Sequence, residues 1–198
     1  MPKPILLVVA AARSKPVRRI VLVCIGLGMV MVLSVATPLL AVPLALSGPG
    51  AGSGRPMVVG EWGYPLAGDY FKGRGFGWFP VEGCAYCSKS HKGYDMSQAC
   101  GVTVFAAGPG RVIRAGSWGT FGNAVEIDHG GGVVTIYGHM MWDSLRVTEG
   151  MNVVAGTPLG LEGTTGASTG CHVHFEVRVD GTAVDPEIWM AARGLPLK

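Results

Sequence analysis

The chain has 198 residues, which is enough for one domain with a proper hydrophobic core and too few for two domains of ordinary size. Its formal net charge of +3 owes much to a basic N-terminus, and residues 47–198 are close to neutral, so nucleic acid is not an expected partner. Hydrophobic residues make up 48% of the chain, and their excess gathers near the N-terminus.

An uncharged apolar run extends from Ile20 to Leu46. At about 1.5 Å per helical residue, the part before Pro38 nearly spans a hydrocarbon core of roughly 30 Å. Basic residues precede the run, so by the positive-inside rule residues 1–19 stay in the cytoplasm and the rest of the chain lies outside. We expect a transmembrane anchor over residues 20–46. A long cleaved signal peptide is the alternative, whereas a buried core helix is disfavoured because the run has no amphipathic stripe.

Residues 47–75 are expected to form a linker and N-terminal extension, which begins with the flexible sequence SGPGAGSGRP. Glycine and aromatic residues recur without a sustained period over residues 57–89, which indicates loops with one or two short strands. The same segment could cover a binding cleft.

From Gly101 onward, short β-rich runs alternate with turn clusters. The runs are VTVFAA, RVIRAG, NAVEIDHG, VVTIYGHM, LRVTEGMNV, TPLGLEG and HVHFEVRV. Only PEIWMAARG predicts a short helix, with Asp185 as its N-cap and Pro186 at the first helical position. The pattern predicts an all-β domain of antiparallel sheets over residues 76–198.

Four of the five cysteines follow the apolar run, and export would place them in an oxidising compartment. They are Cys84, Cys87, Cys100 and Cys171. Disulfides are expected among them, and the sequence does not choose among the three possible pairings. A structural zinc site on the C-x-x-C of Cys84 and Cys87 is the competing interpretation, disfavoured by export and by the lack of a clear second pair.

The stretch CHVHFEVRV, residues 171–179, places two of the five histidines on one strand face. Side chains alternate along a strand, so His172 and His174 share a face with Glu176 and Arg178, while the apolar residues between them face the core. Two adjacent imidazoles gain most from a shared cation or polar ligand. Taken alone, the pair leaves a structural role and a metal or catalytic role equally open.

Other histidines occur in shorter motifs. His91 and Asp95 in HKGYD lie four residues apart, a spacing that suits one face of a strand or of a helix, and Gly93 favours the strand. His139 closes the run IYGHM, whereas His129 stands at a glycine-rich turn and is interpreted as turn chemistry. The pattern HExxH is absent from the sequence, which excludes the helical zinc-peptidase motif.

These motifs follow one another in the order found in the lysostaphin-type (LytM-like) zinc metallopeptidases, which the chain resembles over about residues 76–190. HKGYD, GTFGNAVEIDHGGGVVTIYGHM and TTGASTGCHVHFEVRV carry the resemblance. It implies a lysostaphin-type peptidase domain with an open cleft. It also implies that one Zn²⁺ per chain is held by three residues and flanked by two catalytic histidines. The ligands would be His91, Asp95 and His174, and the catalytic residues His139 and His172.

The implied ligand set leaves an open position for water on the metal, as catalytic zinc sites do, and zinc lowers the pKa of such a water towards about 7. The resemblance therefore implies a zinc endopeptidase that cuts peptide bonds in the stem or cross-bridge of bacterial peptidoglycan. The enzyme would be a single-pass protein of the cell membrane with an extracytoplasmic domain, or secreted if the N-terminal segment is cleaved. A non-hydrolytic cell-wall-binding or hydrolase-activating module on the same fold is the alternative.

Two features depart from the family pattern or add to it. Cys171 stands where relatives carry a small residue or proline; a disulfide is favoured over a metal role because its side chain should point away from His172. A bridge from Cys84 or Cys87 to Cys100 would close a short loop around the first two ligands.

Asn123 and the loop SWGTFG before it match positions that flank the cleft in the family. Both are expected to contact substrate. A hairpin turn that needs glycine and asparagine is the alternative.

Overall fold

The computed structural model describes residues 54–83 and 88–198. The predicted cytoplasmic segment 1–19 and membrane segment 20–46, together with Cys84 and Cys87, lie outside these residues. Within the two described ranges, no helix has the length and apolar character needed to cross a membrane.

The described residues form short strands, one 3-10 turn and one α-helix. In chain order they are β1 (Val58–Val59), β2 (Trp62–Gly63), β3 (Phe71–Lys72), β4 (Gly77–Trp78), β5 (Ser90–His91), β6 (Tyr94–Ser97), β7 (Thr103–Phe105), β8 (Gly110–Ser117), the 3-10 turn Gly119–Phe121, β9 (Asn123–Asp128), β10 (Val133–Met140), β11 (Asn152–Val153), β12 (Pro158–Leu161), β13 (Val173–Val179), β14 (Thr182–Val184) and α1 (Pro186–Ala191).

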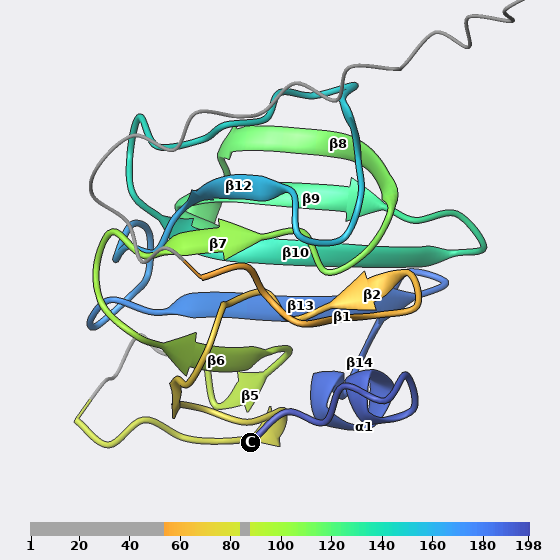
Figure 1. Ribbon diagram of the computed structural model, residues 1–198. Coiled ribbons are helices and arrows are strands. Elements are labelled where there is room, and N and C mark those ends of the chain that lie inside the picture. The colour runs from red at the N-terminus through yellow and green to blue at the C-terminus, as the bar shows by residue number, and fades with distance from the viewer. Residues whose placement is uncertain (1–53, 84–87) are drawn as a thin grey trace, which may run out of the picture. The chain divides into compact units, whose positions relative to one another are not determined.

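Eight strands form the main sheet, in the order β11-β8-β9-β10-β13-β6-β3, with β14 beside the second half of β13 (Figure 1). Every strand pairing in the described residues is antiparallel. The all-β prediction is confirmed, and each β-rich run from residue 102 onward contains a strand. The described residues of the segment 57–89 hold four two-residue strands, more than the one or two that were expected.

The hydrophobic core lies on one side of β13. Val173, Phe175 and Val177 point into it, as the alternation of the strand requires, and all three are fully buried. Val104 and Leu159, from the small sheet of β7 and β12, cover them. Figure 1 shows this small sheet and the β1–β2 hairpin in front of the main sheet.

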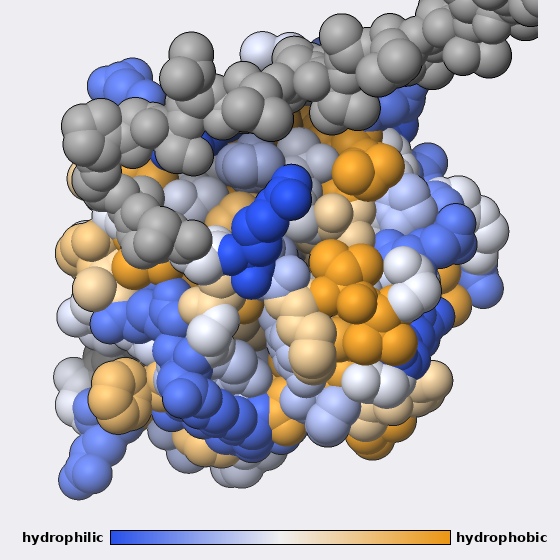
Figure 2. Space-filling model, in the orientation of Figure 1, coloured by the Kyte–Doolittle hydropathy of each residue, from blue (hydrophilic) through white to orange (hydrophobic). Residues whose placement is uncertain are grey.

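The opposite side of β13 is left to polar residues, and this is where the site described below lies. Figure 2 views the molecule from the core-covering side, where apolar and polar patches alternate on the surface. The β1 residues Val58 and Val59 are among the exposed apolar side chains of the domain. The face in Figure 2 is therefore the outside of the core and not the polar side of β13.

The C-terminal helix begins as the sequence predicts. Asp185 caps it, because its carboxylate accepts a hydrogen bond from the backbone N–H of Glu187 at 2.9 Å, and Pro186 opens the first turn. Trp189 and Met190 on its inner face are buried in the core. The helix thus closes the end of the domain next to β14.

Candidate metal centre

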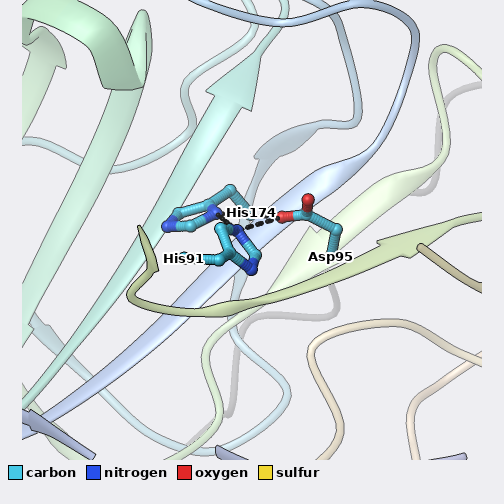
Figure 3. A group of neighbouring side chains, drawn as sticks. All are labelled: His91, Asp95 and His174. Carbon is cyan, nitrogen blue, oxygen red and sulfur yellow. Dashed lines mark hydrogen bonds and ion pairs between the residues drawn. The ribbon is translucent and has the colours of Figure 1, made fainter. Parts of the chain in front are cut away.

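Three polar side chains from three strands meet on the open side of β13. The register of β13 with β6 sets His174 directly opposite Asp95, and β5 contributes His91. His174 Nδ1 lies 2.9 Å from Asp95 Oδ1 and 2.9 Å from His91 Nε2, and His91 Nε2 lies 3.1 Å from Asp95 Oδ1. Figure 3 shows the three side chains pointing toward one another. Their donor atoms form a nearly equilateral triangle.

Two glycines leave room for the His174 side chain. A Cβ on Gly93, in the middle of HKGYD, would lie 2.7 Å from His174 Cε1 and 2.6 Å from the Phe175 carbonyl oxygen, closer than real contacts allow. Gly138 pairs with His174 across β10, and a Cβ there would already touch the His174 Cβ at 3.4 Å. The strands can therefore approach closely around this imidazole because Gly93 lacks a side chain, whereas a Cβ at Gly138 would make only an ordinary contact.

Each imidazole of the triangle is oriented by a bond on its far nitrogen. His91 Nδ1 donates to the Gly75 carbonyl at 2.8 Å, and His174 Nε2 donates to Glu176 Oε1 at 3.0 Å. The other nitrogen of each ring then faces the carboxylate of Asp95. Lone pairs that meet at about 3 Å repel unless a proton or a metal cation lies between them.

The charge around His174 favours such a cation. Burial by itself lowers the pKa of His174, but its hydrogen bonds to Asp95 and Glu176 outweigh burial and raise the pKa to about 9. Without a metal, a proton therefore lies between Nδ1 and Asp95, and a metal cation would replace that proton. Burial pushes the pKa of Asp95 upward, and the bonds from His174 and His91 overcome this and hold the pKa well below its usual range. Two imidazoles and one carboxylate are also the donors that catalytic zinc sites use. His91, Asp95 and His174 therefore fit a divalent transition-metal ion, and zinc in particular.

A β-bulge brings His139 to the same side. Gly138 and His139 together oppose the single residue Ala124 of β9, because the register shifts between Tyr137 and Met140. In a regular strand His139 would share the core face with Tyr137. Instead its backbone adopts φ +62°, so His139 turns toward the cleft while Met140 returns to the core.

His139 and His172 form a second pair beside the triangle, with ring centroids 4.7 Å apart. Their Nδ1 atoms donate to backbone carbonyls, of Thr165 and Gly170 respectively, each at 2.8 Å. Each Nε2 is therefore the nitrogen that faces the cleft, and that of His172 lies 3.7 Å from Asp95 Oδ1. Burial and the neighbouring His172 lower the pKa of His139 to about 4, although the bond to the Thr165 carbonyl acts in the opposite direction. His139 is therefore a neutral imidazole at pH 7, able to accept a proton.

Both groups of histidines open into a cleft of about 400 Å³. Thr120, Phe121 and Ser168 line it on one side, and the cationic side chains of Arg74, Lys92 and Arg178 also reach it. Arg74, Val81 and Ser88 belong to the segment that could have covered the cleft. In the described residues this segment forms a wall of an open cleft.

The disulfide of the described domain joins Cys100 to Cys171. Cys171 is thus in a disulfide, as expected. The alternative bridge from Cys84 or Cys87 to Cys100 does not form, because Cys100 is already paired. The bond connects the end of β6 to the start of β13, which are the two strands that carry Asp95 and His174.

Two candidates lie away from the cleft. Asn123 is buried, and its amide donates to the Met141 carbonyl at 2.6 Å, so its side chain holds a neighbouring loop and does not line the cleft. His129 contacts the Pro109 carbonyl at 2.6 Å and the Thr135 hydroxyl at 2.7 Å. These bonds hold the backbone next to its turn. None of the hydrogen bonds of His129 goes to another histidine.

The sequence did not identify the roles of Glu176 and Arg178. Glu176 contacts His174, and its second oxygen accepts bonds from Arg178 Nε at 3.0 Å and Nη2 at 2.8 Å. The signal was available, because the alternation of β13 already places these residues on the face of His174. Phe121, 5.6 Å from His174 between ring centroids, belongs to the loop that was expected to flank the cleft.

Residues 89–186 match the model of a family described as peptidase family M23. Among curated proteins, the DD-carboxypeptidase/endopeptidase Mpg of Neisseria meningitidis serogroup B is 41% identical over 96 residues, which are 48% of this chain and 22% of that protein. The chain therefore spans about a fifth of that relative's length.

Two solved structures are similar to the domain. The catalytic domain of the antimicrobial peptidase lysostaphin from Staphylococcus simulans is 32% identical, with a TM-score of 0.54, and the match covers 62% of this chain and 92% of that domain. A zinc-containing peptidase from Vibrio cholerae is 30% identical, with a TM-score of 0.56, and the match covers 66% of this chain and 39% of the other.

Proposed function

The chain belongs to peptidase family M23, and from this premise we propose that it is a zinc-dependent endopeptidase that hydrolyses peptide bonds in the stem or cross-bridge of bacterial peptidoglycan. One observation carries the proposal. Donor atoms of His91, Asp95 and His174 converge at 2.9–3.1 Å in an open cleft, beside two further histidines whose Nδ1 atoms bond to backbone carbonyls. The relative described as a DD-carboxypeptidase/endopeptidase and the neighbour described as an antimicrobial peptidase support the substrate class.

His91 Nε2, Asp95 Oδ1 and His174 Nδ1 would hold one zinc ion per chain. When bound, zinc supplies a Lewis acid that activates water and polarises the scissile carbonyl. The protein prepares the site by presenting the three donor atoms in fixed orientations, through the bonds of His91 to Gly75 and of His174 to Glu176. The solved neighbour described as zinc-containing supports the choice of metal.

His139 and His172 are the proposed catalytic residues. Each holds its Nδ1 proton on a backbone carbonyl, so each Nε2 can accept a proton from the attacking water or return one to the leaving amine. The low pKa of His139 keeps its imidazole neutral until it receives that proton. The two rings, with centroids 4.7 Å apart, are close enough to serve the same water and the same leaving group.

The proposed domain organisation follows the sequence. Residues 1–19 are cytoplasmic, residues 20–46 anchor the chain in the membrane, residues 47–75 are a linker and N-terminal extension, and residues 76–198 form the peptidase domain. The disulfide between Cys100 and Cys171 supports an extracytoplasmic location for that domain, because disulfides persist in oxidising compartments.

Two substitutions test the proposed roles. In the full-length chain purified in detergent, His174→Ala is expected to lose bound zinc and hydrolysis of isolated peptidoglycan together. His139→Ala is expected to keep one zinc per chain and lose turnover by about 10²–10⁴-fold, the usual contribution of general acid–base catalysis. Zinc is measured by elemental analysis, and products by mass spectrometry of defined muropeptides, which also identifies the bond that is cut.

The non-hydrolytic wall-binding or activating module remains the second outcome of this experiment. It predicts one bound zinc and no released peptide from any muropeptide, and that result would overturn the peptidase. Near-full turnover in His139→Ala would instead reject the assigned role of His139 and leave the peptidase in place. His129→Ala is the matched histidine control, because His129 does not line the cleft, and it should retain both zinc and turnover.

A further inference from the structure

Two further residues of β13, Glu176 and Arg178, stand on the same face as the proposed zinc ligand His174. We infer that Glu176 and Arg178 form a positioning pair: Glu176 fixes the tautomer and ring orientation of His174, and Arg178 fixes Glu176. The inference rests on the proposed zinc site and deepens it. Neither residue is proposed to touch the metal or the substrate.

The contact between Glu176 and His174 determines which nitrogen of the ring faces the other ligands. Glu176 Oε1 lies 3.0 Å from His174 Nε2, on the side of the ring opposite to Asp95 and His91. A carboxylate accepts hydrogen bonds and does not donate them. Nε2 must therefore carry the hydrogen in this contact, and Nδ1 must supply the lone pair to the proposed metal. Without this contact His174 could present either tautomer.

Burial makes the contact specific. Glu176 is only 2% exposed, so water cannot take the place of its partners. The carboxylate is balanced on its other oxygen by Arg178, whose Nε and Nη2 reach Oε2 at 3.0 and 2.8 Å. The two bonds from Arg178 therefore hold Glu176 with its other oxygen aimed at His174, and this forked geometry suits arginine better than lysine.

The strand itself explains why the pair lies here. His174, Glu176 and Arg178 are alternate residues of β13, so their side chains stand in a row on the cleft side. Each can reach only its neighbours in the row. Arg178 therefore acts on the metal site through Glu176 and has no direct contact with His174 among its hydrogen bonds.

Zinc affinity of the full-length chain in detergent, measured by competition with a chromogenic chelator, tests the inference. Glu176→Ala is expected to bind zinc about 10–100-fold more weakly than the wild type, as is usual when a partner of a ligating histidine is lost. Glu176→Gln, whose amide oxygen can still accept the Nε2 hydrogen, should recover part of the loss. Arg178→Ala should lose less than Glu176→Ala, and the double variant should lose no more than Glu176→Ala alone.

The main sheet offers a matched control. Glu126 on β9 pairs with Arg114 at 3.4 Å, and it stands in the same cross-strand row as Glu176, with Ile136 between them. Glu126→Ala removes a carboxylate from a strand ion pair without touching His174 and should leave zinc affinity unchanged. Thermal unfolding of the metal-free proteins shows whether each variant remains folded.

Three results would overturn the inference. They are unchanged zinc affinity in folded Glu176→Ala, additive losses in the double variant, and a wild-type chain that binds no zinc. The proposed function fails separately, since a wild type that binds zinc and leaves peptidoglycan intact contradicts the peptidase, while the affinity series still decides the role of Glu176 and Arg178.

Discussion

His139 adopts a backbone conformation that glycine tolerates better than any residue with a Cβ. Its φ is +62°, and a left-handed conformation costs an ordinary residue about 1–2 kcal/mol. The strain accompanies the bulge at Gly138 and His139. This bulge turns the imidazole from the core side of β10 to the cleft. The domain thus accepts a local loss of stability at one proposed catalytic residue.

This strain predicts an unusual order of stabilities. Both His139→Gly and His139→Ala remove the imidazole and its bond to the Thr165 carbonyl, so they differ only in the Cβ. We expect His139→Gly to be more stable than His139→Ala by about 1 kcal/mol, as measured by urea unfolding of the full-length chain in detergent.

At a control position on the same strand, the glycine variant is expected to be less stable than the alanine variant. Val134 lies in the regular part of β10, where glycine costs about 0.5–1 kcal/mol relative to alanine, so Val134→Ala should be more stable than Val134→Gly. If the alanine variant were more stable than the glycine variant at position 139 as well, the backbone of His139 would not be strained.

The polar residues of the site were predictable to different degrees. Alternation along β13 alone identifies His172 and His174 as neighbours on one face, and it needs no knowledge of other strands. The position of His139 depends on a two-against-one pairing with Ala124, which no periodic pattern encodes. Asn123 matched a position at the cleft but lies buried, because its amide finds a partner in the Met141 carbonyl. Residues whose role depends on cross-strand partners were the ones that periodicity alone could not assign, and for His139 the family resemblance supplied the role.

At the scale of elements, the site depends on the register of β6 against β13. Asp95 and His174 face each other in that register, and the Cys100–Cys171 disulfide closes the same pair of strands at one end. Ser97 adds a hydrogen bond from its hydroxyl to the Cys171 carbonyl at 2.8 Å. The disulfide and the hydrogen bonds between the strands therefore both hold β6 against β13.

Loss of this disulfide is expected to destabilise the domain. It closes a loop between residues 71 positions apart, and removing a native disulfide of this kind costs about 2–5 kcal/mol of unfolding free energy. The double variant Cys100→Ser, Cys171→Ser should therefore unfold at lower urea concentration than the wild type under oxidising conditions.

Reduction provides the control for that measurement. Dithiothreitol should lower the stability of the wild type, whereas its effect on the double variant reports only on the other cysteines of the chain. Equal stability of the oxidised wild type and the double variant would contradict a stabilising role for this bond.

Element lengths explain what else was predictable. β8, β9, β10 and β13 have six to eight residues, enough for alternation and turn residues to mark them. β1 to β5 have two residues each, and so short a run has no period to detect. Even HKGYD divides into β5 and β6, with Lys92 and Gly93 between them, although its ends still meet at one site.

At the scale of the whole molecule, the sequence proposes a peptidase domain held at a membrane by residues 20–46. The full-length chain is expected to sediment with membranes and to resist extraction by alkaline carbonate. Lysines at two central positions, Val30→Lys with Leu33→Lys, should release it, because each costs about 2.5–3.5 kcal/mol at the centre of a membrane helix.

The same change at exposed β1 positions, Val58→Lys with Val59→Lys, is the matched control and should leave the chain in the membrane fraction. Release of the wild type by carbonate would reject the anchor. A mature protein whose mass lacks the first 46 or so residues would establish the cleaved signal peptide in its place.

Strand β13 carries the proposed ligand His174, with Glu176 and Arg178, on one face and core side chains on the alternate positions of its seven residues. A replacement at one position changes one of the two faces. An insertion or deletion of one residue at the start of the strand would exchange the faces, sending the His174 imidazole toward the core and valines into the cleft. The length of this strand is therefore a stricter limit on how the chain can evolve than the identity of most of its residues.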